Sequence, residues 1–269
     1  MGIGCQHQKG SPAPGAEPQE RLRIRVYGKA EDPTLIYLPG IHGDWTLIGP
    51  FRHELGTGIR FVEMTYPRTC DWSLADYARE IEAGLLQQGI EGGWLLGESF
   101  GSQVLWELVR RAESRWHGLI LAGGFVRYPA PPLLGIAEHL CPRVPHRLLH
   151  RLLPAYLLYS RLRHSRIPGG LEAAREFIER RTEADQRAVT RRLRLIAEAD
   201  PRPVASSTRL ALHHLYGAID PIVPWGPVAR WLRLHAPTLR ASHRIWYSDH
   251  TVLASAARES VAQVRQWMA

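Results

Sequence analysis

A glycine-bounded serine between an apolar run and a helical segment is the feature that most constrains the fold of this chain. Residues 97–101 read Gly-Glu-Ser-Phe-Gly, directly after the apolar residues 94–96. Apolar side chains then recur at helical spacing over residues 102–111. This pattern predicts a strand over 93–98, a sharp turn and a helix, with Ser99 in a strained backbone conformation at the turn. The two glycines leave no side chain to clash beside Ser99.

Short apolar runs and segments of helical periodicity alternate along most of the chain. Alternation at this spacing predicts an α/β protein with a mostly parallel, doubly wound sheet that helices cover on both faces. The further strands are expected at residues 21–27, 34–38, 60–64, 117–122, 210–216 and 243–247. The further helices are expected at residues 45–55, 73–89, 227–234 and 252–268.

The alternation stops between residues 125 and 208. This stretch contains no convincing strand, and its helical patterns fall at residues 133–139, 144–159, 171–181 and 185–199. A helical insertion between two strands of a sheet would form a separate cap. The expected organisation is a flexible tail at residues 1–20, an α/β core at 21–124 and 209–269, and a helical cap at 125–208, inserted after the sixth strand.

Composition excludes several classes of protein. With 269 residues and 45% apolar side chains, the chain can bury a substantial core and is globular rather than disordered. Its apolar runs fall far short of the ~20 residues that a bilayer span needs, and residues 1–20 lack the apolar core of a signal peptide. Three cysteines are too few and too scattered for a disulfide framework or a metal site. We expect a cytoplasmic protein without metal, cofactor or membrane-spanning segment.

The positive charge is concentrated in the expected cap. The net charge is +8, and residues 125–208 hold fifteen arginines against eight acidic residues. Because the chain has only two lysines, genome base composition explains the arginines better than phosphate recognition does, and no nucleic-acid partner is expected. Arginines interleave with leucines from Arg143 to Arg166, which would suit an acidic carrier protein or an anionic membrane surface. The simpler interpretation, which we favour, is that arginine stems cover an apolar cap face.

Two later loops supply the groups that a reactive serine requires. A serine hydroxyl needs a neutral imidazole to take its proton and an acid to orient that imidazole. In a doubly wound sheet both come from loops at the carboxyl ends of strands. Asp220 and His250 lie in two such loops, after strands 210–216 and 243–247. Asp249 is a rival acid, although a sequence neighbour of His250 cannot easily reach its ring, and Asp220 has the alternative role of capping its own turn.

Three other polar residues of these strands have structural interpretations. His213 and His214 lie inside an expected strand and are interpreted as packing or surface residues. Glu98 points away from the Ser99 side if its strand continues to alternate, so a structural role is expected for it.

The order Ser99, Asp220, His250, together with the point of insertion, resembles the α/β-hydrolase superfamily, and in particular the small serine esterases with a helical cap. The resemblance covers residues 21–269. Ser99 matches the family's nucleophile, Asp220 the acid of its G-x-x-D-x-x-V-P motif, and His250 its late histidine before the last helix. Ser248 and Asp249 stand where many members have Gly-Gly or Gly-His.

The resemblance also implies an oxyanion hole made of backbone N–H groups. Phe100, directly after the nucleophile, supplies one of them. Residues 39–44 resemble the family's H-G-x-x-G loop with proline in place of histidine, which makes Ile41 the second donor, while a rival register makes it Asp44. The expected pocket residues flank this site and are His42, Trp45, Phe125, Tyr128 and Trp225.

Such a site implies a serine hydrolase that cleaves a small apolar carboxylic ester through an acyl-enzyme. The same machinery would serve an acyl thioesterase, or a methyl esterase acting on an acidic carrier protein docked at the arginine-rich cap. A third possibility is a non-catalytic protein that binds a small ligand, because hydrolase folds also serve without catalysis. Relatives that act on haloalkanes or epoxides have aspartate where this chain has Ser99, which disfavours that chemistry.

Overall fold

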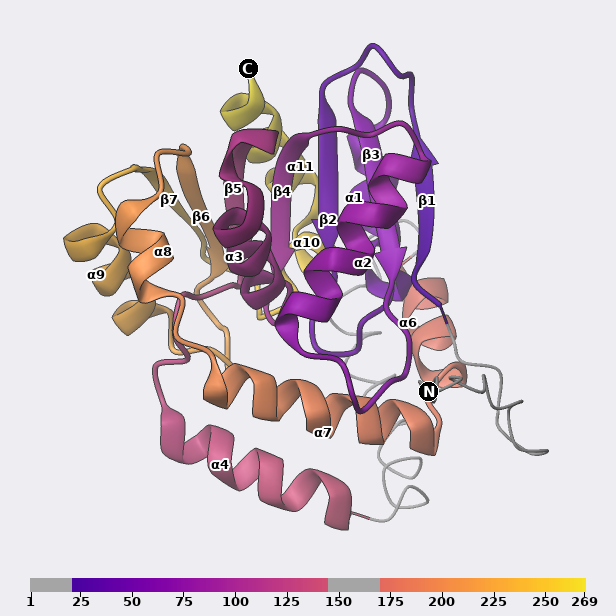
Figure 1. The fold of residues 1–269 in the computed structure, drawn as a ribbon, viewed down its shortest axis with the longest axis vertical. Helices are drawn as coiled ribbons and strands as arrows, with labels where there is room; N and C mark the ends of the chain where they lie inside the picture. The colour runs from indigo at the N-terminus through magenta and orange to yellow at the C-terminus, as the bar shows by residue number, and fades with distance from the viewer. Residues whose placement is uncertain (1–20, 145–169) are drawn as a thin grey trace, which may run out of the picture.

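The computed structural model describes residues 21–144 and 170–269, which contain one seven-stranded sheet (Figure 1). The strand order is β1-β3-β2-β4-β5-β6-β7, and only β1 runs antiparallel to its neighbour. This confirms the expected mostly parallel sheet. The strands are β1 (Arg23–Tyr27), β2 (Thr34–Leu38), β3 (Arg60–Thr65), β4 (Gly93–Glu98), β5 (Trp116–Ala122), β6 (Leu212–Gly217) and β7 (Leu239–Ile245).

Helices lie on both faces of this sheet and beyond one of its ends (Figure 1). The α-helices of the described ranges are α1 (Gly49–Leu55), α2 (Leu74–Gln87), α3 (Gly101–Ala112), α4 (Pro131–Leu140), α6 (Gly170–Glu179), α7 (Glu183–Glu198), α8 (Arg202–Ser207), α9 (Trp225–His235), α10 (Val252–Ser255) and α11 (Ala257–Met268). Short 3-10 helices are η1 (Thr46–Ile48), η2 (Glu113–Arg115) and η3 (Cys141–Arg143). None of the helices in these ranges is long and apolar enough to cross a membrane.

The central strand β2 contributes to two hydrophobic cores because successive residues of a strand point to opposite faces. Ile36 and Leu38 pack with residues of α2 and α3, whereas Leu35 and Tyr37 pack with residues of α1 and α11. All four side chains are at most 1% exposed. Burial on both faces explains why the sequence shows an unbroken apolar run here.

Capping boxes start helices α2 and α7. At α2, Ser73 accepts a hydrogen bond from the Asp76 N–H, and at α7 Thr182 accepts one from the Asp185 N–H. The second box starts α7 at Glu183, two residues before the expected position. The first turn of α7 was not recognised in the sequence because its residues are mostly polar and show no apolar periodicity.

Two boundaries near the C-terminus differ from the expectation. β7 spans Leu239–Ile245 and not 243–247, since it is an edge strand whose first residues are only partly buried or exposed and so form no apolar run. Trp246 and Tyr247 were expected to belong to the strand. They lie instead in the loop that follows it, where they are 67% and 54% exposed. The single helix expected at 252–268 is two helices, because Ala256 leaves helical geometry with φ −137° and ψ 48°.

Four described helices, α4, α6, α7 and α8, connect β5 to β6. They follow the fifth strand and not the sixth, because the five apolar runs before residue 125 correspond one to one to β1 through β5. The helices α4 and α7 lie side by side across one end of the sheet (Figure 1). The expected tail at 1–20, almost all of the expected helix at 144–159 and most of the arginine-rich run lie outside the described residues.

Candidate active site

The turn after β4 holds Ser99 in a strained conformation. Its φ is +49°, the one positive φ of a non-glycine residue in the described ranges. The Ser99 N–H donates to Ala122 O (3.2 Å), and Ser99 O accepts from the Ser102 N–H (2.9 Å). A Cβ at position 97 would lie 3.0 Å from Gly101 O, and one at position 101 would lie 2.0 Å from Leu38 O. Backbone crowding on both sides of the serine therefore requires the two glycines.

The loop after β6 brings Asp220 to His250. His250 Nδ1 and Asp220 Oδ2 are 2.8 Å apart, while Asp220 Oδ1 accepts from the N–H groups of Ile222 (2.8 Å) and Val223 (2.9 Å). The Asp220 side chain is 1% exposed. Both roles considered for Asp220 are thus present in one carboxylate, which caps its turn with one oxygen and holds the imidazole with the other. Because an ionised carboxylate only accepts hydrogen bonds, Nδ1 carries the proton and Nε2 is left to act as a base.

The rival acid Asp249 has partners of its own. Its Oδ1 accepts from the Thr251 N–H (3.0 Å) and from the Thr251 hydroxyl (2.9 Å). Glycines make room for this corner of the site, since a Cβ at Gly217 would lie 2.2 Å from Asp249 O and one at Gly123 would lie 2.8 Å from His250 O.

A cavity of about 730 Å³ lies at the carboxyl edge of the sheet, and both Ser99 and His250 line it. Its other walls come from α4 and α7, which contribute Leu134, Val189 and Leu193 among others. Apolar side chains dominate these walls, so the cavity suits an apolar group placed against Ser99.

The two N–H groups expected to bind an oxyanion lie beside Ser99. Ile41 lines the cavity, and a Cβ at the preceding Gly40 would lie 3.6 Å from the Ser99 Cβ. Phe100 directly follows Ser99, and its side chain is buried against the rings of Tyr66 and Tyr77. Within the described part of the chain, neither the Ile41 N–H nor the Phe100 N–H donates a hydrogen bond. The described residues therefore leave both donors unused.

The five expected pocket residues divide into two groups. His42, Phe125 and Tyr128 line the cavity, but Trp45 and Trp225 do not. Trp45 is 5% exposed in the core on the α1 face, with the guanidinium of Arg25 3.8 Å from its ring centre. Trp225 stacks on Tyr216 and donates to Ala218 O (3.2 Å). Both indoles pack against other side chains outside the cavity. Their closeness in sequence to the site residues therefore wrongly suggested that they line the pocket.

His42 lies in a polar corner of the cavity. Its ring meets Phe177 edge to face, with ring centres 4.7 Å apart. Burial, and then the charge of Arg181, lowers the pKa of His42 to about 4, so its imidazole is neutral at neutral pH. Nearby protein atoms desolvate the ring, although His42 itself is exposed and lines the cavity.

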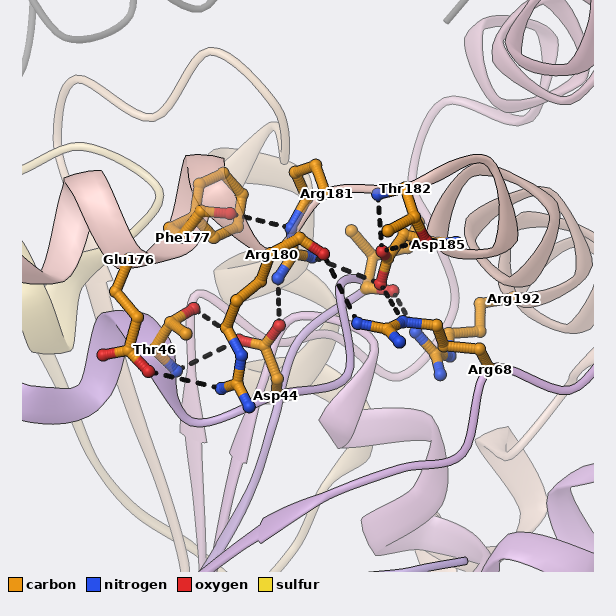
Figure 2. Close-up of polar contacts among 11 residues, drawn as sticks. Asp44, Thr46, Arg68, Glu176, Phe177, Arg180, Arg181, Thr182, Asp185 and Arg192 are labelled. Carbon is orange, nitrogen blue, oxygen red and sulfur yellow. Dashed lines mark hydrogen bonds and ion pairs between the residues drawn. The ribbon is translucent and has the colours of Figure 1, made fainter. Parts of the chain in front are cut away.

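Ion pairs join this corner to Arg181, in the turn between α6 and α7, and to Asp185 of α7. Figure 2 shows Asp44 and Arg181 pointing toward one another, an ion pair whose side chains are 9% and 11% exposed. Asp44 also accepts from the N–H and hydroxyl of Thr46, and Arg68 Nε lies 2.9 Å from Asp185 Oδ1. Burial alone would raise the pKa of Asp44, but the charge of Arg181 and the Thr46 hydrogen bonds outweigh it and lower that pKa. Asp44 is thus an ionised partner of Arg181.

Two residues of this site were not expected from the sequence. Glu98, for which a structural role was expected, lines the cavity and accepts a hydrogen bond from the hydroxyl of Tyr37, and burial raises its pKa. Arg192 is buried on α7 and donates to Ile41 O at 2.8 Å. Its signal was the spacing of Ala188, Arg192 and Ile196, which puts an arginine on the apolar face of the helix. His213 and His214 are buried in β6 as packing residues.

The fold matches those of known hydrolases. No protein-family model and no curated protein matches the sequence. One similar solved structure is an esterase from Thermogutta terrifontis, with a TM-score of 0.72 and 19% identity over 92% of each chain. Another is the esterase RhEst1 from Rhodococcus sp. ECU1013, with a TM-score of 0.73 and 16% identity over 92% of this chain and 94% of that one. An enol-lactonase from Burkholderia xenovorans LB400 is similar as well, with a TM-score of 0.75 and 17% identity over 92% of this chain and 96% of that one. The chain therefore has the α/β-hydrolase fold.

Proposed function

We propose that the protein is a serine hydrolase that cleaves a carboxylic ester. The observation that carries the proposal is the assembly, around one cavity, of a serine in a strained turn and an imidazole held by a buried carboxylate. The esterases and the enol-lactonase of the same fold support this reaction class. Identity below 20% to each of them leaves the substrate to be argued from the site itself.

The reaction follows from the chemistry of three side chains. Ser99 Oγ attacks the acyl carbon while Nε2 of His250 takes its proton, and Asp220 stabilises the resulting imidazolium. The Ile41 and Phe100 N–H groups stabilise the tetrahedral oxyanion. The intermediate collapses with cleavage of the ester C–O bond, and the imidazolium protonates the leaving alcohol. Water, deprotonated by the same imidazole, then attacks the acyl-enzyme and releases the acid.

The walls of the cavity support a small apolar acyl group as the substrate. We assign the region 125–208 as a cap over a core of 21–124 and 209–269, because α4 and α7 supply the apolar walls that face Ser99. Phe125 and Tyr128 add aromatic surface to the same walls. An apolar acyl chain buried against them gains about 25 cal/mol for each Å² removed from water.

Labelling by a fluorophosphonate tests whether Ser99 is an activated nucleophile. We expect the wild-type protein to be labelled and Ser99→Ala not to be. A set of p-nitrophenyl esters and acyl thioesters of graded chain length then separates an esterase from a thioesterase through the ratio of kcat/KM values. A wild-type protein that is neither labelled nor able to hydrolyse any of these substrates would overturn the proposal in favour of a ligand-binding protein.

A further inference from the structure

A buried arginine of α7 contacts the loop that is proposed to bind the oxyanion. Arg192 is 1% exposed, and its guanidinium makes three hydrogen bonds to residues of the core. Nη1 donates to Ile41 O (2.8 Å), Nη2 to Pro67 O (3.1 Å) and Nε to the Tyr77 hydroxyl (3.1 Å). One side chain of α7 thereby connects three segments of the core.

The acceptors of these three hydrogen bonds are all neutral groups. No carboxylate within the described ranges forms an ion pair with it, and its guanidinium lies 5.6 Å from the ring centre of Tyr66 and 6.0 Å from that of Tyr77. Burying a cation without an anion is costly, and an apolar residue of similar volume would hold α7 against the core at lower cost. Packing of the helix alone therefore does not account for an arginine at this position.

The guanidinium also fixes the shape of the loop. Gly43 has a φ of +72°, and a Cβ at this position would lie 2.5 to 2.6 Å from the guanidinium atoms of Arg192. The Gly43 N–H donates to Gly40 O (2.9 Å), and Gly43 O accepts from the Tyr66 N–H (2.7 Å). Arg192 thus contacts the loop at Ile41 and at Gly43, on either side of His42.

We infer that Arg192 is a positioning residue, which holds residues 40–43 so that the Ile41 N–H is directed at the developing oxyanion. The inference rests on the proposed hydrolase function and adds a residue that touches neither the substrate nor Ser99. It also makes α7 part of the catalytic framework, because the alignment of one oxyanion donor depends on a side chain from the region between β5 and β6. Arginine suits this role because its planar fork reaches several acceptors in fixed directions.

The neighbouring arginine provides a matched control. Arg191 lies on the same helix and donates to Trp72 O at 3.3 Å, so it also ties α7 to the core. Within the described ranges, Arg191 forms no hydrogen bond or ion pair with residues 40–43. Replacing Arg191 by methionine removes an anchor of α7 and leaves the loop untouched, which separates loosening of the helix from misalignment of the loop.

The test compares Arg192→Met, Arg192→Lys and Arg191→Met in the full-length protein. With p-nitrophenyl butyrate, we expect kcat of Arg192→Met to fall about 10²-fold while KM changes less than about 2-fold, the pattern for loss of an interaction made in the transition state. Fluorophosphonate labelling of Ser99 should slow by a similar factor. Arg192→Lys should recover part of the rate, because an ammonium can reach some of the acceptors, and Arg191→Met should keep kcat within about 2-fold.

Two results would overturn the inference. One is a folded Arg192→Met with unchanged kcat, and the other is a loss of kcat in Arg191→Met as large as that in Arg192→Met. If Arg192→Met does not fold, Arg192→Lys provides the test, because its ammonium keeps the charge but cannot reach all three acceptors in fixed directions. That variant should then lose kcat at constant KM, and an unchanged kcat would contradict the inference. An unlabelled and inactive wild-type protein would instead overturn the proposed function.

Discussion

His250 Nδ1 lies 2.8 Å from Asp220 Oδ2, although thirty residues separate the two in the chain. The loops after β6 and β7 bring them together because parallel neighbouring strands end at the same edge of the sheet. Asp220 holds the ring with one oxygen while its other oxygen is held by the N–H groups of Ile222 and Val223. The backbone N–H groups therefore hold the carboxylate in place independently of its contact with the imidazole.

Replacing this carboxylate by an amide should remove activity without unfolding the loop. In Asp220→Asn the side-chain oxygen can still cap the turn, but the amide favours the wrong tautomer of His250. We expect kcat to fall about 10³- to 10⁴-fold with little change in the midpoint of urea unfolding. Asp249→Asn, the variant of the rival acid, should lose far less. A larger loss in Asp249→Asn than in Asp220→Asn would assign the acid to Asp249.

The strained turn should show itself in stability. Ser99 has a φ of +49°, a conformation that costs an L-residue about 1 kcal/mol and a glycine almost nothing. Ser99→Gly should therefore be more stable to urea than Ser99→Ala by about 1 kcal/mol, while both lack the nucleophile. Equal unfolding free energies for the two variants would mean that the turn relaxes when the serine hydroxyl is removed.

The fold could be predicted from the sequence where one physical rule decided the pattern. Burial on both faces made β2 an unbroken apolar run, and backbone crowding required the glycines around Ser99. Edge strand β7 was placed too late because its first residues are only partly buried or exposed and form no apolar run. Local signals suffice where local sterics or burial dominate.

Residues whose positions are set by contacts between different elements could not be predicted in this way. Trp45 and Trp225 are close in sequence to the site, yet each packs away from the cavity on a side chain that no local pattern identifies. Arg181 and Arg192, by contrast, are far from the site in the sequence but contact it in the structure. Their partners Asp44 and Ile41 lie well over a hundred residues earlier. Such pairs are set by the docking of α7 and of the turn before it on the core, which sequence periodicity does not describe.

Two buried histidines of β6 should make the protein sensitive to acid. Burial lowers the pKa of His214 to about 3, and burial together with Arg240 lowers that of His213 to about 4. In the unfolded chain both titrate near pH 6.5, so between these values the unfolded state binds more protons and stability is lost as the pH falls.

Urea unfolding at pH 7, 5.5 and 4.5 measures this effect. The free energy of unfolding should decrease by about 1.4 kcal/mol per pH unit for each histidine below pH 6. His214→Gln should reduce the slope by the contribution of one histidine. His139→Gln, at an exposed position of α4, should leave the slope as in the wild type. A slope that His214→Gln does not change would mean that His214 is protonated in the folded state.

The walls of the cavity should determine which acyl chains are accepted. Val189 of α7 lines the cavity, and a phenylalanine there would occupy volume that a long acyl chain needs. Val189→Phe should lower kcat/KM for p-nitrophenyl decanoate at least about 10-fold and leave the acetate within about 2-fold, in line with 1–3 kcal/mol per displaced apolar group. Val204→Phe on α8 is the control, because Val204 packs on the same core without lining the cavity. If both variants lower kcat/KM equally at every chain length, the loss reflects disturbed packing, and the cavity beneath α7 is not the acyl site.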